Sequence, residues 1–366
     1  MKGLERCVLV EYIEVDGSLG EGGGQVLRYS LALSALTLKP VRVFNIRAKR
    51  DNPGLRPQHL AAVKALAEVS GAEVKGASPG SMEVWFRPRR RVHGSLSIDV
   101  GTAGSVSLVI QAILPVLLYS PGESTITVRG GTDVPWSPPV DYMSLVFTHN
   151  LKPMGVEAFV RLLKRGHYPR GGGVVEVRVK PVSKPLKSLN LVKRGRPLKA
   201  AVVSHSVRLP RHVAERQASA ASSLVEKVLG IKPEVVLDAQ PPESDTHLGP
   251  GSGVLVYVEA EPWVRLGGDS LGEKGKPAEK VGEEAFRKLV EDYETGMAFD
   301  RHMGDMLIPY LFLAQGVSRI GVARITSHLA TALEISKLFF PSAEARVEGV
   351  VEGPGVVEVK SPGFQP

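Results

Sequence analysis

Apolar and polar positions recur in the same order twice along the first half of the chain. Between residues 8 and 88, an apolar segment typical of a strand leads through a glycine-rich turn into a segment with helical periodicity. A second strand, an amphipathic helix and two short strands follow. We expect these elements at 8–15, 25–36, 41–46, 57–69, 72–74 and 82–87. The segment therefore predicts the order β-α-β-α-β-β.

The same order is predicted between residues 96 and 181. After a strand at 96–100 and an apolar helix that ends near residue 118, the remaining elements are expected at 124–128, 140–151, 156–162 and 174–179. A third, nearly complete copy is expected at 302–314, 318–325, 328–339, 343–350 and 355–359. Repetition with a period of roughly 85 residues indicates an internal duplication.

The segment between the second and third copies differs in composition. Lys and Pro are dense from 184 to 200, which we interpret as a boundary or linker. Further strands and helices are expected at 200–207, 210–229, 234–238, 253–259, 264–268 and 278–295. We therefore predict an α/β (α+β) fold with two domains. Residues 1–184 plus 298–366 would form a large domain of three repeats, and 185–297 a smaller inserted α/β domain.

Composition narrows the classes of protein to consider. The chain has 366 residues, 43% hydrophobic and 23% charged, which suits a folded protein with a sizeable core. Its one cysteine, Cys7, excludes an internal disulfide and a cysteine-based metal site. No signal peptide is indicated and no apolar run is long enough to span a bilayer, so we expect a soluble, cytoplasmic protein. The net charge of +8 favours an anionic partner such as nucleic acid or a nucleotide.

The glycine-rich turn at 20–24 joins the first predicted strand to the first helix. Backbone N–H groups in such a turn can face an anion at the helix N-terminus. No Gly-Lys-Ser/Thr follows, so this is not a Walker-type loop. Glu21 would repel a phosphate directly, but it can hold a divalent metal (Mg²⁺ or Mn²⁺) that bridges to phosphate. A packing turn with a solvated glutamate is the alternative.

Several cations cluster in the loop before the second helix. Arg47 and Arg50 lie at its start, and a guanidinium can contact phosphate through two N–H groups. Gln58 and His59 open the helix that follows, so their side chains are expected near the same anion pocket. A solvated basic loop is the alternative.

Two more segments suit a nucleotide pocket. A small-residue turn at 101–105 opens an almost wholly apolar helix, in which Gln111 needs a hydrogen-bond partner from a ligand or from the protein itself. The segment 130–139 is stiffened by prolines and contains Trp136. It can wall a nucleobase pocket or serve only as a shaped connection.

His328 differs from the other histidines by its position. It follows Thr326 and Ser327, either of which can cap the helix that begins there. The positive end of that helix would lower the imidazole pKa, and a neutral imidazole is a nucleophile. A helix-start histidine without a chemical role is the alternative. Asp305 opens another helix, where capping explains it as well as catalysis does.

Taken together, these segments resemble the RNA 3′-terminal phosphate cyclase family. The matching stretches are 16–25, 46–59, 101–111, 130–139, 167–173 (His-Tyr-Pro-Arg-Gly-Gly-Gly), 210–216 and 326–329. They follow in order along nearly the whole chain. The resemblance implies three β-α-β-α-β-β units similar to the C-terminal domain of translation initiation factor three, with a smaller inserted α/β domain.

The resemblance also implies an activity and roles for single residues. Family members convert an RNA 3′-phosphate to a 2′,3′-cyclic phosphate with ATP and a divalent metal, releasing AMP and pyrophosphate. His328 falls on the family's nucleophile and Glu21 on its metal-linked glutamate. The substrate-phosphate positions fall on Arg28, Arg47, Arg50, Gln58 and His59. The ATP positions fall on Gln111, Pro138, His302, Asp305 and Met306, with His302 replacing a tyrosine that bacterial members place against adenine.

The implied mechanism passes through a covalent histidine–AMP intermediate at His328. Three other interpretations fit parts of the sequence. A non-catalytic cyclase-like RNA-binding protein in ribosomal RNA processing shares the fold but lacks the nucleophile. An enolpyruvyl transferase needs six copies of the repeat, and a plain RNA-binding scaffold needs no combination of Glu21, Asp305 and His328. RNA ending in a 3′-phosphate and ATP are therefore the expected partners, and an oligomer is possible.

Overall fold

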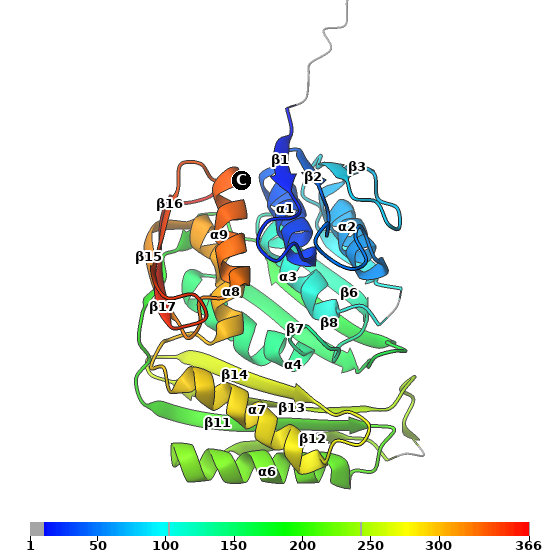
Figure 1. Cartoon of the computed structure of the whole chain (residues 1–366), viewed down its shortest axis with the longest axis vertical. Helices are drawn as coiled ribbons and strands as arrows, with labels where there is room; N and C mark the ends of the chain where they lie inside the picture. The colour runs from blue at the N-terminus through cyan, green and yellow to red at the C-terminus, as the bar shows by residue number, and fades with distance from the viewer. Residues whose placement is uncertain (1–10, 102, 242–243, 366) are drawn as a thin grey trace, which may run out of the picture.

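Four β-sheets and the helices that pack on them make up this computed structural model (Figure 1). The structure describes residues 11–101, 103–241 and 244–365. Parts of the predicted strand at 8–15 and of the predicted turn at 101–105 therefore lie outside the described residues. Among the helices described, none is both long and apolar enough to cross a membrane.

The first sheet has the strand order β1-β2-β4-β3. Its first two strands are parallel, and β4 runs antiparallel to both of its neighbours. A helix follows each of the two parallel strands. The elements are β1 (Ile13–Asp16), α1 (Gly24–Thr37), β2 (Val41–Phe44), α2 (Pro57–Ser70), β3 (Glu73–Lys75) and β4 (Val84–Arg87).

The second sheet repeats this arrangement, with the order β5-β6-β8-β7 and the same parallel and antiparallel pairs. The helical stretch after β6 is continuous but changes its winding, with one π-helical segment that the sequence did not predict. The elements are β5 (Gly94–Asp99), α3 (Val106–Leu118), β6 (Ser124–Gly130), α4 (Val140–Tyr142), the π-helix η1 (Met143–Phe147), α5 (Thr148–Leu151), the 3₁₀-helix η2 (Lys152–Met154), β7 (Glu157–Lys164) and β8 (Gly173–Lys180).

The third sheet has the order β10-β15-β17-β16, and β9 also pairs with β15. Its first strand is parallel to β15, as in the other two sheets. That strand, however, lies more than a hundred residues before its partner in the chain. The elements are β9 (Leu186–Lys187), β10 (Asn190–Leu191), α8 (Arg301–Leu313), β15 (Ala314–Val322), α9 (Ser327–Phe339), β16 (Glu344–Gly349) and β17 (Gly355–Pro362).

The inserted module lies between β10 and α8 and forms the fourth sheet, with the order β12-β11-β13-β14. Its two helices pack against each other and against this sheet, at the bottom of the view in Figure 1. The elements are β11 (Pro197–Val207), α6 (His212–Leu229), β12 (Glu234–Ala239), β13 (Gly251–Ala260), β14 (Val264–Leu271) and α7 (Ala278–Tyr293).

The helices of the first three sheets face one another in the centre of the molecule, with the sheets outside (Figure 1). α1 contacts α2, α3 and α9, while α8 packs on α9. α3 is buried along nearly its whole length because almost every one of its side chains is apolar. This packing brings the N-termini of several helices toward one region.

The mixed α/β fold class predicted from the sequence is confirmed. The segment 184–200, interpreted as a boundary or linker, contains β9, β10 and the beginning of β11, so it is not a linker without secondary structure; whether a domain boundary lies there stays a prediction. Two-residue strands contain too few positions to show periodicity. The predicted domain boundaries and the likeness of each unit to initiation factor three stay predictions. Since β9 and β10 pair with β15, we propose that the inserted domain begins near residue 192 rather than 185.

Candidate active site

The beginnings of five helices surround two neighbouring clefts. The larger, of about 820 Å³, is lined by residues from the first turns or caps of α1, α2, α3 and α9. The smaller, of about 470 Å³, is lined by the beginnings of α8 and α9. Each helix start presents unpaired backbone N–H groups and the positive end of the helix dipole. The shared region therefore favours anions such as phosphates.

His328 is the second residue of α9 and lines both clefts. The helix begins there because the Thr326 side chain accepts a hydrogen bond from the Leu329 N–H at 3.0 Å. The Thr326 hydroxyl in turn donates to Asp305 of α8. Gln25 of α1 donates from Nε2 to the His328 carbonyl at 2.8 Å. The backbone of His328 is thus tied to helices from the first and third sheets, while its side chain is half exposed.

Glu21 lies beside His328 in the turn between β1 and α1. Its Oε1 accepts a hydrogen bond from the Ser327 hydroxyl and lies 4.0 Å from His328 Nδ1. Its Oε2 lies 3.4 Å from a guanidinium nitrogen of Arg50. The hydrogen bond from Ser327 is the largest of the effects that lower the pKa of Glu21. The carboxylate is therefore ionised at neutral pH and lies near the imidazole.

The pKa of His328 is lowered from its ordinary value. Burial is the main cause, and the charges of Arg28, His302 and Arg50 act in the same direction. The Glu21 carboxylate opposes them without cancelling them. A lowered pKa keeps the imidazole neutral at pH 7, which is the state that can act as a nucleophile.

Arg28 projects from α1 and lines both clefts. Burial lowers the pKa of its guanidinium to about 10, so it is still charged at neutral pH. Among the described residues, the guanidinium has neither a carboxylate partner nor a hydrogen-bond acceptor. Arg28 is partly buried, and a partly buried cation without a counter-ion is unfavourable, so a bound phosphate would stabilise it.

The loop between β2 and α2 forms the basic wall of the larger cleft. Arg47 has a left-handed backbone (φ 56°), and its guanidinium donates to the carbonyls of Asn52 and Gly54. His59 accepts a hydrogen bond at Nδ1 from the Arg56 N–H at 3.1 Å, which leaves the hydrogen of the neutral ring on Nε2. Burial, together with Arg47, Arg28 and Arg56, lowers the pKa of His59 to about 4. His59 is therefore a neutral donor.

The smaller cleft combines apolar surfaces with a partly buried acid, Asp305. The Tyr29 hydroxyl donates to the Asp305 carbonyl at 2.8 Å, and it also contacts the side-chain amides of Gln25 and Gln111. Gln111 therefore has a partner within the protein and also lines the cleft. Burial raises the pKa of the Asp305 carboxyl to about 8.

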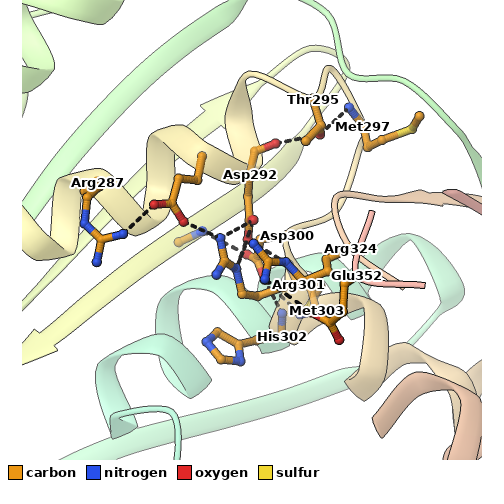
Figure 2. A network of polar contacts seen from close by, with 12 residues as sticks. Arg287, Asp292, Thr295, Met297, Asp300, Arg301, His302, Met303, Arg324 and Glu352 are labelled. Carbon is orange, nitrogen blue, oxygen red and sulfur yellow. Dashed lines mark hydrogen bonds and ion pairs between the residues drawn. The ribbon is translucent and has the colours of Figure 1, made fainter. Parts of the chain in front are cut away.

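A network around Asp300 fixes the beginning of α8 (Figure 2). Asp300 caps the helix by accepting from the backbone N–H groups of His302 and Met303 at 3.0 and 2.8 Å. The same buried side chain accepts from the Tyr142 hydroxyl at 2.7 Å and from the Gly267 N–H at 2.9 Å. The network therefore joins the second sheet's helix, the inserted module and α8, and it sets the position of His302 in the cleft.

All the predicted site residues lie around the two clefts. The larger cleft is lined by Glu21, Arg28, Arg47, Arg50, Gln58, His59 and His328, and the smaller by Arg28, Gln111, Pro138, His302, Asp305, Met306 and His328. Their roles stay predictions. Sequence reasoning did not select Ser327 or Tyr168 as single residues, although both line the larger cleft. Trp136, which was noted only as part of a loop, lines both clefts and is 98% exposed.

Comparisons with known proteins identify a family for this chain. Residues 19–345 match the family described as RNA 3′-terminal phosphate cyclase. Two archaeal proteins of that name are similar over nearly their full lengths. The protein from Desulfurococcus amylolyticus is 60% identical (97% of this chain, 99% of the relative), and that from Staphylothermus marinus is 55% identical (98% and 100%).

The chain belongs to the RNA 3′-terminal phosphate cyclase family. A third relative of the same name, from Ignicoccus hospitalis, is 53% identical and covers 95% of this chain and 98% of its own length. Among solved structures, the enolpyruvyl transferase NikO from Streptomyces tendae aligns with 95% of this chain and 81% of its own, at 10% identity. Its TM-score is 0.19, too low to support a statement about fold.

The Asp300 network yields a prediction for stability. Asp300→Ala removes the acceptor of four donors, three of them buried and one partly buried, so we expect the free energy of unfolding to fall by about 2–4 kcal/mol. Chemical denaturation followed by circular dichroism measures this change. Asp51→Ala, at an exposed aspartate for which the structure shows no hydrogen bond or ion pair, is the control and should change stability by less than about 0.5 kcal/mol. Equal effects in the two variants would contradict the assigned role.

Proposed function

We propose that this protein uses ATP to convert an RNA 3′-phosphate into a 2′,3′-cyclic phosphate, through a covalent AMP adduct on His328. One observation carries the proposal. A half-exposed, neutral histidine lies where two clefts meet, and both clefts are lined by Arg28, whose guanidinium has no counter-ion among the described residues. In this proposal ATP occupies the smaller cleft, the RNA end occupies the larger, and the AMP group moves from one to the other at His328.

His328 attacks through Nε2. Nδ1 faces the Glu21 carboxylate at 4.0 Å, which favours the tautomer with the hydrogen on Nδ1 and leaves the lone pair on Nε2. Nε2 forms a bond to the α-phosphorus of ATP, and the bond to pyrophosphate breaks. Gln25, Thr326 and Ser327 keep the nucleophile in position through their contacts with the first turn of α9 and with Glu21. Positioning of this kind lowers the entropic part of the barrier.

The cations around His328 stabilise charge that develops on the phosphates. Arg28 is suited to the α-phosphate because it borders both clefts and has no counter-ion within the described chain. Arg47, Arg50, Gln58 and His59 are suited to the RNA 3′-phosphate because they line the larger cleft. His59 donates from its neutral Nε2, so its contribution does not depend on protonation. Such pre-positioned donors act most strongly where water is excluded.

The smaller cleft suits the adenosine part of ATP. Pro138 and the His302 imidazole offer flat faces for a base, and Met306 provides a buried apolar contact. Asp305, with its raised pKa, can donate a hydrogen bond when protonated and accept one when ionised. Replacement of the bacterial tyrosine by His302 leaves a smaller stacking surface, so we expect weaker discrimination between adenine and other bases.

Glu21 would hold a divalent metal ion in the larger cleft. It is the one carboxylate among the described residues that line the larger cleft, and Mg²⁺ is commonly held by one or two carboxylates together with substrate phosphates. When bound, such an ion would neutralise phosphate charge and make pyrophosphate a better leaving group. In the structure, the Ser327 hydroxyl and Arg50 contact the Glu21 carboxylate.

The second half of the reaction returns the histidine to its free state. An oxygen of the RNA 3′-phosphate attacks the AMP phosphorus, and the bond to Nε2 breaks. Nδ1 keeps the hydrogen that it carried when Nε2 attacked, so the ring leaves as a neutral imidazole and His328 gains no net proton. The terminal 2′-oxygen then attacks the 3′-phosphorus, closes the ring and expels AMP. Nucleophile and electrophile share one ribose, so this step is intramolecular.

The adduct provides the first test of the mechanism. Incubation with α-labelled ATP and Mg²⁺ should label the protein, and a phosphoramidate should survive alkali and be lost in acid. His328→Ala should abolish labelling. His212→Ala is the matched control, because His212 is an exposed histidine in the first turn of α6 and lines neither cleft. Labelling that persists in His328→Ala would rule out this nucleophile.

The lowered pKa of His328 predicts its titration. Because burial and neighbouring cations disfavour the imidazolium, the neutral form should persist below the ordinary histidine pKa of about 6.5. An NMR titration of the free protein, with the resonance assigned from His328→Ala, measures the midpoint. A midpoint at or above 6.5 would contradict the electrostatic description of the site.

The RNA end requires its own test. RNA with a 3′-phosphate should become resistant to phosphatase in the presence of ATP, whereas RNA with a 3′-hydroxyl should stay unchanged. RNA whose last nucleotide is 2′-deoxy and carries a 3′-phosphate should accept AMP but fail to cyclise, so the anhydride should accumulate. Adduct formation without any transfer to 3′-phosphate RNA would exclude the cyclase activity and leave the adenylylation standing.

A further inference from the structure

A cluster of buried ligating side chains lies outside the two clefts, where the second sheet meets the inserted module. Asp133 follows β6, His167 lies between β7 and β8, and His205 lies on β11. They are 1%, 7% and 2% exposed. One ligating atom from each lies within 4.8 Å of the others. The cyclase reaction proposed above uses none of the three.

The spacing of these atoms fits ligands of a single ion. His167 Nε2 and His205 Nε2 are 3.0 Å apart, and His205 Nε2 is 3.9 Å from Asp133 Oδ1. Zn²⁺ binds nitrogen and oxygen at about 2.0–2.1 Å, so two tetrahedral ligands lie about 3.3 Å apart. The two observed distances lie on either side of that value. The contact of 3.9 Å is too long for a hydrogen bond, yet an ion held by both atoms would bridge it.

The charges around the cluster also favour a dication. Arg165 is almost wholly buried and pairs with three carboxylates: Asp133 at 3.2 Å, Asp141 at 2.9 Å and Asp238 at 2.7 Å. One guanidinium cannot balance three carboxylates when all of them are ionised. A divalent ion at Asp133 would restore neutrality. Arg165 would then hold the metal-bound carboxylate from outside, a common arrangement around metal ligands.

The neighbouring strand leaves room for the two imidazole rings. On β13, a methyl group at Gly251 would lie 2.1 Å from the ring of His167. A methyl group at Gly253 would lie 2.8 Å from Cε1 of His205. A side chain at either position would therefore clash with the ring that it faces. The inserted module therefore contributes one histidine and the open surface on which both histidines meet.

We propose that Asp133, His167 and His205 bind a divalent transition-metal ion, and that Zn²⁺ suits their two-nitrogen, one-oxygen donor set best. The ion fastens the inserted module to the second sheet. It also fixes two loops that border the larger cleft, since Asp133 precedes Trp136 by three residues and His167 precedes Tyr168 directly. Its role is structural, because its ligands are buried and do not line that cleft.

Metal content tests the proposal directly. The full chain, purified without a metal-affinity step and dialysed with excess Zn²⁺ followed by metal-free buffer, should retain about one equivalent by plasma mass spectrometry. His167→Gln and His205→Gln should each lose it. His149→Gln is the matched control. His149 also joins the second sheet's helix to the inserted module, with Nε2 2.7 Å from the Trp263 carbonyl, but it does not belong to the cluster, so this variant should retain the metal. Glu21→Ala should retain it too, which separates this ion from one in the cleft.

A second readout covers variants that fail to fold. Co²⁺ bound in place of Zn²⁺ should give the visible absorption of a tetrahedral nitrogen and oxygen site, and chelation should lower the melting temperature of the wild-type protein. Wild-type protein that retains no metal would overturn the proposal in favour of a hydrogen-bonded pair of neutral histidines. Metal that stays bound in both His167→Gln and His205→Gln would overturn it as well. Neither result depends on labelling by ATP.

Discussion

The convergence of helix N-termini is the constraint on which the candidate site depends. In the first two sheets a helix follows each parallel strand, and in the third α9 follows β15, so the first turn of each helix lies near the carboxyl end of its strand; α8 instead follows the inserted module. Packing the helices against one another in the centre brings α1, α2, α3, α8 and α9 toward the same two clefts. The resulting concentration of positive dipole ends is a property of the backbone. The side chains of Arg28, Arg47 and Arg50 add to a field that the fold already provides.

Within this field, contacts and burial set the protonation states of two acids, Glu21 and Asp305, and of two histidines, His59 and His328. Glu21 stays ionised because Ser327 and Arg50 contact it, whereas burial raises the pKa of Asp305. His59 and His328 both stay neutral, for a shared reason: burial and nearby arginines disfavour the imidazolium. They differ in which nitrogen is free. A backbone N–H occupies Nδ1 of His59 and makes it a donor, while Glu21 beside Nδ1 of His328 favours a free lone pair on Nε2.

The sequence predicted most elements of the fold, because the helices and strands that line the core are long enough to show their periods. It did not predict β9 and β10, whose two-residue lengths have no period and whose partner β15 lies beyond the inserted module. For the site, residue type and helix position selected Glu21, Arg47 and His328. Arg28 entered only through the family resemblance, since nothing in its local sequence shows that its charge is unpaired. The cluster of His167 and His205 was missed because its members belong to different sheets.

The interruption of the third sheet has a consequence for the order in which the protein can assemble. β10 pairs with β15, so Asn190 cannot pair with Arg319 until the chain has been synthesised to that point. The whole inserted module is synthesised during that interval, and its own strands pair with partners that are closer in the sequence. The residues proposed to bind phosphate in the basic wall of the larger cleft are therefore synthesised long before α9. A nascent chain carries these proposed phosphate ligands well before it carries His328, the residue proposed to react.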